Sequence, residues 1–245
     1  MSDKELDDNI DKFQQAVDLG RKSHTDQFRK SGEPYFFHPL RVALMAARHW
    51  MGFNSVFAAL LHDVVEDTPV TLEEVRKQFG NEVALLVNGL TKAADENLSR
   101  DLLKEKTYRK QLLAAVEDIR VLCLKFWDRI DNLQTIGALP ASKQSLIAEE
   151  TRKVYVPLAL HLGMGYVATE LDSLSLRILY PTRAKRYQDG IDEVRKSSES
   201  FLRKFRASIH STLDHQKISF SLSDRWRPFS IQAARHVSRG LLAVY

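Results

Sequence analysis

One histidine and three carboxylates gather in six residues, His62-Asp63-Val-Val-Glu66-Asp67. On a helix, His62 and Glu66 are four residues apart, as are Asp63 and Asp67, so each pair shares one ridge. An apolar run over residues 57–61 precedes them, and this run is predicted to be a largely buried part of the helix. Acids that emerge from a buried helix repel one another and lose solvation unless a cation neutralises them. The cluster therefore predicts a divalent metal ion, and the alternative is an exposed helix end with solvated acids.

Two distant segments carry residues of the same types. His38 stands directly before Pro39, where a helix is predicted to begin. Asp128 follows a mostly apolar segment, residues 121–127. Two histidines and two aspartates would form a mixed nitrogen–oxygen site, which suits Mn²⁺ or a similar ion that keeps waters in open positions.

The elements that must position these residues are predicted to be helices. Apolar periodicity and helix-stop signals divide most of the chain into helical segments. Their predicted ranges are 10–17 with an end near Gly20, 40–50, 55–65, 71–80, 82–90, 101–117, 119–134, 143–162 with a kink at Pro157, 166–180 and 182–213. Thr71 and Glu74 form a predicted capping box. The clear strand signal is the alternation over 217–223, so we expect an all-α domain followed by a small α+β appendix.

Charge is unevenly distributed in a chain of 245 residues with a net charge of +4. Residues 197–245 contain eight Lys or Arg and three Asp or Glu, so the excess positive charge lies in the C-terminal part. We expect nucleic acid not to be a partner, because no recognised reading motif accompanies this charge. The single cysteine, Cys123, excludes an internal disulfide and a multi-cysteine zinc site.

The expected location is the cytoplasm. A lone cysteine fits a reducing compartment. No apolar stretch approaches the roughly 20 residues needed to span a bilayer, so no membrane is expected as a partner. The charged start of the chain is unlike a signal peptide.

The order His38…His62-Asp63…Asp128 resembles the HD-domain phosphohydrolase pattern. Over residues 10–182 the sequence resembles one branch, the RelA/SpoT-type hydrolases, which degrade the stringent-response alarmone guanosine 3′,5′-bis(diphosphate), ppGpp. The matching strings are Arg29-Lys-Ser-Gly-Glu-Pro-Tyr35, His38-Pro-Leu, Ala59-Leu-Leu-His-Asp-Val-Val-Glu-Asp-Thr68, Phe79-Gly80, Leu90-Thr-Lys92, Asp118-Ile-Arg-Val121, Ala148-Glu-Glu-Thr151 and Pro157-Leu-Ala159. The fold that this resemblance implies is an all-α HD-domain helical bundle.

The resemblance also implies roles for individual residues. The implied metal ligands are His38, His62, Asp63 and Asp128, and the implied ion is Mn²⁺. The implied catalytic acids, which orient and activate the attacking water, are Glu66 and Asp67. The implied substrate-binding residues are Arg29, Lys30, Ser31, Asn132 and Thr135, with Arg29 placed against the base.

Three positions depart from the family pattern. Asp131 replaces a histidine and Gln134 an arginine, which lowers the positive charge expected near an anionic substrate. His161 stands where an arginine is usual. Residues 218–231 resemble a degenerate or truncated entry to an alarmone synthetase domain. We therefore expect an HD-type metal-dependent phosphohydrolase domain over 1–196 and a basic extension over 197–245.

Three functions remain open at this stage. The first is a Mn²⁺-dependent 3′-pyrophosphohydrolase that converts ppGpp or its pentaphosphate into pyrophosphate and GDP or GTP. The second is an HD phosphohydrolase of another nucleotide, such as the adenine analogue or a phosphomonoester, which the Asp131 and Gln134 departures keep open. The third is a non-catalytic alarmone-binding regulatory module. Such a module would be expected to lose metal ligands or the acid pair, and all six of these residues are present.

Overall fold

The computed structural model describes residues 3–93 and 99–220. Within those ranges the chain is helical and contains no strand, apart from one isolated β-bridge between Phe28 and Pro34. The prediction of an all-α fold is therefore confirmed for this part of the chain. The chain divides into two compact units, Met1–Pro140 and Ala141–Tyr245.

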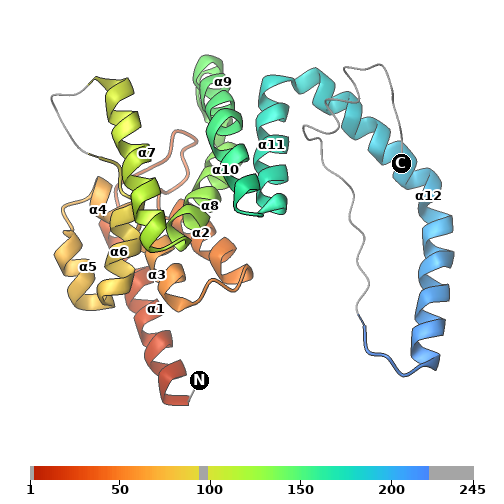
Figure 1. Cartoon of the computed structure of the whole chain (residues 1–245), viewed down its shortest axis with the longest axis horizontal. Helices are drawn as coiled ribbons and strands as arrows, with labels where there is room; N and C mark the ends of the chain where they lie inside the picture. Colours follow the sequence, from red (N-terminus) through yellow and green to blue (C-terminus); the bar gives the residue numbers. More distant parts are fainter. Residues whose placement is uncertain (1–2, 94–98, 221–245) are drawn as a thin grey trace. The chain divides into compact units, whose positions relative to one another are not determined.

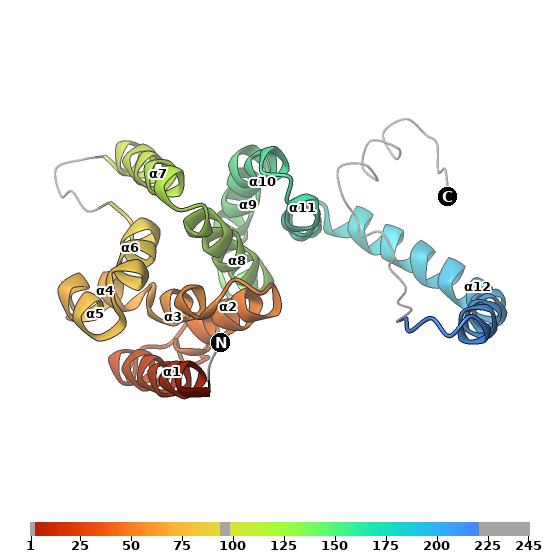
Figure 2. The same cartoon turned by 60° about the horizontal axis from the view of Figure 1, so that its bottom comes forward.

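The first unit carries all the residues predicted to do chemistry. Its helices are drawn in red to green in Figures 1 and 2. They are α1 (Asp3–Ser23), α2 (Phe37–Arg48), α3 (Phe53–Leu61), α4 (Val64–Asp67), α5 (Leu72–Phe79), α6 (Asn81–Leu90), α7 (Arg100–Glu117), α8 (Arg120–Gln134) and the short 3₁₀ helix η1 (Ile136–Ala138).

Helix α3 is the centre of the first unit. It packs against α1, α2, α6 and α8, which surround it in Figure 2. The run Phe57–Leu61 is completely buried. Two consecutive alanines, Ala58 and Ala59, let the neighbouring helices approach closely, and the larger side chains fill the remaining volume. The apolar run that precedes the histidine is thus the core of this unit, as the sequence predicted.

The first helix continues past Gly20, where its end was predicted, and reaches Ser23. A Cβ added at Gly20 would lie 2.7 Å from a ring carbon of Phe36 and 3.2 Å from the carbonyl oxygen of Leu60. Gly20 therefore serves the close approach of α1 to α3 and does not terminate the helix.

The predicted helix over 55–65 is interrupted at two of the predicted metal ligands, His62 and Asp63. Helix α3 ends at Leu61, and α4 begins at Val64 after a turn at His62 and Asp63. The imidazole Nδ1 of His62 lies 2.8 Å from the carbonyl oxygen of Ala59, which in a continuous helix would accept from the Asp63 backbone N–H. The side chain thus competes with the helix for this carbonyl. The prediction of one unbroken helix was wrong at this point.

Helix α5 begins as predicted. The Thr71 hydroxyl accepts from the Glu74 backbone N–H at 3.2 Å, and a Glu74 carboxylate oxygen accepts from the Thr71 backbone N–H at 2.7 Å. This reciprocal capping box is confirmed. Val75 and Phe79 are buried where α5 packs on α6.

The second unit begins with a helical column that contains one irregular turn. Its elements are α9 (Ala141–Glu150), the π-helix η2 (Thr151–Tyr155), α10 (Val156–His161), α11 (Gly165–Leu179) and α12 (Pro181–His215). Pro157 lacks a backbone N–H, so the preceding turn widens into a π-helix where a kink was predicted. Helix α11 runs back along this column, as Figure 1 shows.

The predicted α+β appendix is not shown. Residues 217–220 of the predicted strand are not a strand in the structure, and residues 221–245 lie outside the described residues. None of the helices in the described ranges combines the length and the hydrophobicity that a bilayer-spanning segment needs.

Candidate metal centre and active site

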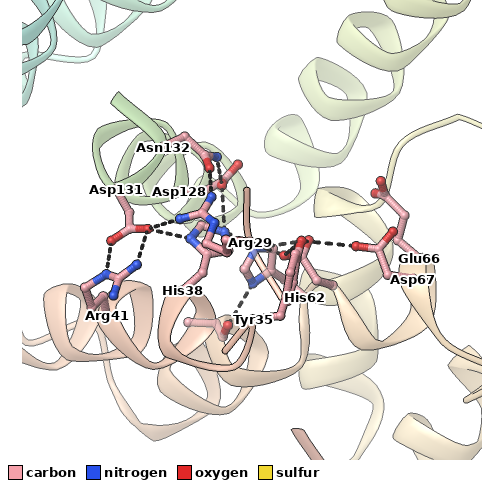
Figure 3. A network of polar contacts seen from close by, with 12 residues as sticks. Arg29, Tyr35, His38, Arg41, His62, Glu66, Asp67, Asp128, Asp131 and Asn132 are labelled. Atoms are coloured by element: carbon pink, nitrogen blue, oxygen red, sulfur yellow. Dashed lines mark hydrogen bonds and ion pairs between the residues drawn. The ribbon is translucent and has the colours of Figure 1, made fainter. Parts of the chain in front are cut away.

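The predicted metal ligands come together from three places in the first unit. His38 lies in the first turn of α2, and His62 and Asp63 form the turn between α3 and α4. Asp128 lies on α8, and Figure 3 shows it with His38 and His62. The packing of α3 against both α2 and α8 brings these segments together. His38, His62 and Asp128 are buried, and the Asp63 side chain is 14% exposed.

The distances between these side chains suit a single cation. His38 Nε2 lies 3.2 Å from Asp128 Oδ1 and 3.6 Å from Asp63 Oδ2. His62 Nε2 lies 3.2 Å from Asp63 Oδ1. One possible ligand atom from each of His38, His62 and Asp128 falls within 4.8 Å of the other two. Two imidazole nitrogens and carboxylate oxygens form the mixed donor set that Mn²⁺ or Fe²⁺ accepts.

The hydrogen bonds of the two histidines provide an independent test of metal binding. Nδ1 of His62 is engaged by the Ala59 carbonyl, while its buried Nε2 makes no hydrogen bond although it lies 3.2 Å from Asp63 Oδ1. A buried polar atom without a partner costs free energy, and a metal ion at this position would satisfy it. Nδ1 of His38 lies 2.7 Å from Asp131 Oδ2, which leaves Nε2 facing the cluster. Both rings thus have the arrangement typical of metal ligands, so the residues fit the group.

The electrostatics of the cluster also favour a cation. Burial would raise the pKa of Asp128, but Lys125 and His38 hold it well below its usual value; Lys125 Nζ lies 2.6 Å from Asp128 Oδ2. Burial would likewise raise the pKa of Asp63, and the charges of His62 and His38 outweigh that effect and lower it. Burial would lower the pKa of His38, yet hydrogen bonds to Asp128 and Asp131 raise it to about 9. The site therefore holds ionised carboxylates and attracts positive charge.

The two predicted catalytic acids have different surroundings. Asp67 is linked to the cluster through Tyr35, whose hydroxyl lies 2.9 Å from Asp63 Oδ2 and 3.1 Å from Asp67 Oδ2. Burial raises the pKa of Asp67, and so do the charges of Asp63 and Glu66. A raised pKa makes this carboxylate a stronger proton acceptor.

Glu66 is bound to Lys92, which follows α6. The Lys92 ammonium pairs with Glu66 Oε1, and the Lys92 backbone N–H donates to Oε2 at 3.0 Å. Burial would lower the pKa of Lys92, but its pairing with Glu66 raises it. The Lys92 contact was not predicted, although Lys92 belongs to one of the strings that carry the family resemblance.

Three of the predicted substrate-binding residues contact one another beside the metal cluster. Arg29 Nη1 donates to Thr135 Oγ1 at 2.9 Å, and Nη2 donates to Asn132 Oδ1. Asn132 Nδ2 donates in turn to the metal-ligand candidate Asp128, at 2.6 Å from Oδ1. The predicted base-binding arginine therefore lies one side chain away from a predicted metal ligand.

Lys30 and Ser31 lie apart from this group. Both are exposed on the loop that reverses direction between Arg29 and Glu33. Gly32 permits this turn because its φ is +84°, a value that other residues rarely adopt. Among the described residues, neither side chain forms a hydrogen bond to the cluster.

The sequence did not predict the contacts of Tyr35, Arg41 and Asp131. Arg41 Nη1 and Nη2 bind the Glu33 carboxylate at 2.6 and 2.9 Å, and its Nε donates to Asp131 Oδ1 at 2.5 Å. The Asp131 charge is thus paired inside the protein. The signal in the sequence was that Asp131 replaces the histidine usual in the family. This replacement does not by itself identify the side chains that Asp131 contacts.

Residues 16–165 match the HD-domain family, and this range contains every residue predicted to act in the site. The chain belongs to the HD-domain family.

Its relatives are RelA/SpoT-type proteins. The chain is 40% identical over 197 residues to a guanosine-3′,5′-bis(diphosphate) 3′-pyrophosphohydrolase of Aquifex aeolicus, which covers 80% of this chain and 28% of the relative. It is 37% identical over 221 residues to the bifunctional (p)ppGpp synthase/hydrolase SpoT of Escherichia coli strain K12, covering 89% of this chain and 31% of the relative. The resemblance to RelA/SpoT-type HD hydrolases is therefore confirmed.

The chain spans less than a third of the length of these two curated relatives. Among solved structures, a metazoan ortholog of SpoT that hydrolyses ppGpp aligns with a TM-score of 0.47 and 25% identity, over 67% of this chain and 85% of that one.

Proposed function

We propose that this chain is a Mn²⁺-dependent hydrolase that removes the 3′-pyrophosphate of ppGpp or its pentaphosphate. The products would be pyrophosphate and GDP or GTP. The observation that carries the proposal is the convergence of His38, His62 and Asp128, with Asp63 Oδ1 3.2 Å from a buried His62 Nε2 that makes no hydrogen bond. The names of the relatives supply the substrate class.

Each group of residues has a defined task in this proposal. His38, His62, Asp63 and Asp128 would hold the ion, which when bound lowers the pKa of a coordinated water and polarises a phosphoryl oxygen. Asp67, with its raised pKa, would accept the proton of the attacking water, and Tyr35 would hold that carboxylate in place.

The remaining residues would bind the nucleotide. Arg29 would lie against the base, and Asn132 and Thr135 would contact the ribose and phosphate region. Lys30 and Ser31, exposed on the adjoining loop, would line the pocket entrance. Glu66 would act with Asp67 on the water while Lys92 holds its carboxylate.

The proposal includes a cytoplasmic location and an HD-type hydrolase domain over residues 1–196, with 197–245 as a separate basic extension. The lone cysteine fits a reducing compartment. The site residues all fall between 29 and 135, well inside that domain.

The test is product analysis with the purified full chain. With Mn²⁺ and ppGpp, we expect GDP and pyrophosphate in equal amounts. Excess chelator should abolish turnover, and Mn²⁺ should restore it better than Zn²⁺ because the ligand set contains no thiolate. Turnover that persists in excess chelator would contradict a metal mechanism.

The same assay separates the other two functions. The adenine analogue and a phosphomonoester are offered beside ppGpp at equal concentration. Faster hydrolysis of either one would favour the alternative substrate. Tight binding of ppGpp without any product, in protein shown to contain metal, would favour a regulatory module.

A further inference from the structure

Asp131 makes several hydrogen bonds beside the metal cluster, although the mechanism above does not use it. It lies on α8, one helical turn beyond Asp128, and is fully buried. Oδ2 lies 2.7 Å from His38 Nδ1 and 3.0 Å from Arg29 Nη1. Oδ1 lies 2.5 Å from Arg41 Nε (Figure 3). One buried carboxylate thus joins three segments of the chain.

The contact with His38 decides which ring nitrogen faces the cluster. When Nδ1–H donates to Asp131, Nε2 is the ring nitrogen that faces Asp63 and Asp128, and its lone pair would serve a cation held between them. A carboxylate in this position also makes the imidazole a stronger ligand than a neutral acceptor would. The His62 ring is oriented through its Nδ1 by the neutral Ala59 carbonyl. The two histidines are therefore held by acceptors of different strength.

Arg41 explains how Asp131 can remain charged in this place. Burial would raise the pKa of Asp131, but hydrogen bonds from His38 and Arg41 outweigh burial and lower it. Arg41 is itself fixed by the Glu33 carboxylate on the loop that presents Arg29. The acid is therefore built into the structure with its counter-ion.

The contact with Arg29 closes a ring of interactions around the site. Arg29 binds Asp131 on one side and Asn132 on the other, and Asn132 binds Asp128. Asp128 faces His38, which returns to Asp131. A change at Asp131 would therefore disturb a metal ligand and the predicted base-binding arginine together.

We propose that Asp131 is a positioning residue of this site: it orients and strengthens His38 as a metal ligand and holds Arg29 in place for the nucleotide. This inference rests on the proposed function, because it requires that the cluster bind a metal ion. It predicts that metal affinity depends on a residue that does not touch the metal.

The experiment compares Asp131→Asn with Asp172→Asn in the full chain. Asp172 is also a buried carboxylate, paired with Arg152 Nε at 3.0 Å, but it lies in the second unit. Each variant loses an ion pair between a buried carboxylate and a partly exposed arginine. Mn²⁺ binding to metal-stripped protein is measured by calorimetry, beside the thermal midpoint.

We expect Asp131→Asn to weaken Mn²⁺ binding roughly 10- to 100-fold, the usual cost of removing a residue that supports a metal ligand. Asp172→Asn should keep the wild-type Kd for Mn²⁺ even where its thermal midpoint falls. At saturating Mn²⁺, Asp131→Asn should also raise KM for ppGpp, because Arg29 loses one of its anchors. An unchanged Mn²⁺ affinity in Asp131→Asn would overturn the inference.

A second variant covers the case in which Asp131→Asn fails to fold because Arg41 loses one of its two carboxylate partners. Asp131→Asn combined with Arg41→Gln removes acid and counter-ion together and is compared with Arg41→Gln alone. We expect weakened Mn²⁺ binding only in the double variant, and equal affinities would overturn the inference. If the wild-type chain itself binds no Mn²⁺, both this inference and the proposed function fail. If the wild-type chain binds Mn²⁺ and the Asp131 variants bind it equally tightly, this inference fails and the proposed function stands.

Discussion

Glu66 and Asp67 are adjacent in sequence but face different partners. Asp67 shares the Tyr35 hydroxyl with the metal-ligand candidate Asp63, whereas Glu66 is paired with Lys92. Asp63 lies 3.2 Å from His62 Nε2 and 3.6 Å from His38 Nε2, and among the described residues neither Glu66 nor Asp67 makes such a contact with either histidine. Metal binding and proton transfer should therefore be separable by single substitutions.

The first separation uses Glu66→Gln. Glutamine keeps the length of the side chain and an oxygen for the Lys92 backbone N–H, but it removes the charge and the proton acceptor. We expect normal metal content with turnover lowered by about 10²- to 10⁴-fold, the usual loss for a positioned acid–base group. Metal stoichiometry and rate are measured on the same sample. Loss of the ion would make Glu66 a ligand, and full activity would place the chemistry elsewhere.

The complementary change is Asp63→Asn. Asp63 lies within 3.6 Å of both histidine Nε2 atoms, so its charge should be part of the metal site. We expect weaker Mn²⁺ binding and activity that partly returns at high Mn²⁺, because an amide oxygen is a poorer ligand than a carboxylate. A titration of rate against Mn²⁺ concentration checks this. A rate that stays low at every concentration, with normal metal content, would assign Asp63 to the chemical step.

The residue types of the site were predictable, but their pairing was not. His38, His62, Asp63 and Asp128 stand in a family pattern, so their convergence could be expected from sequence. Asp131 was expected to lower the positive charge near the substrate. The structure shows it buried with Arg41, a partner 90 residues away, and no local pattern specifies a contact over that separation.

At the scale of elements, the turn at His62 and Asp63 shows where periodicity fails. Apolar spacing continues smoothly from α3 into α4, so it predicts one helix. At the break, the His62 ring lies 2.8 Å from the Ala59 carbonyl oxygen, a side-chain contact that apolar spacing does not encode. The same bond leaves His62 Nε2 facing the cluster. The local departure from helix is thus coupled to the predicted metal role.

The capping box of α5, in contrast, was predicted from the sequence, and its contribution to stability can be tested by substitution of Thr71. Thr71→Ala removes the hydroxyl that accepts from the Glu74 backbone N–H. We expect the free energy of unfolding to fall by about 1 kcal/mol, the typical cost of an N-cap threonine. Denaturant melts of Thr71→Ala and Thr71→Ser provide the measurement, because serine keeps the capping oxygen. Equal losses in the two variants would show that the methyl group, and not the cap, is responsible.

At the scale of the whole molecule, two ways of dividing the chain give different boundaries. Contacts separate Met1–Pro140 from Ala141–Tyr245, whereas the HD-domain match extends to residue 165. The predicted domain boundary at 196 stays a prediction. All predicted site residues lie in the first unit, so the candidate chemistry falls on one side of every proposed boundary.

The last prediction concerns how much of the chain the site needs. Of the 35 residues of α12, Ala184 alone is buried, and it packs with Leu176 and Tyr187. Phe201 and Phe205 are 66% and 52% exposed. Among the described residues, a chain that ends at Asp189 keeps the Ala184 cluster and loses little buried apolar area. Its thermal midpoint should therefore stay within about 2 °C of the full chain.

Mn²⁺ affinity and ppGpp hydrolysis should also be unchanged in the chain that ends at Asp189, because the candidate ligands lie between residues 38 and 128. A chain that ends at Tyr180 is the matched control, since it also removes Ala184 and Tyr187 from their cluster with Leu176. Its thermal midpoint should fall because that buried contact is lost. A tenfold loss of turnover in the chain that ends at Asp189 would mean that residues beyond 189 take part in the site. That result would contradict the assignment of the site to the first unit.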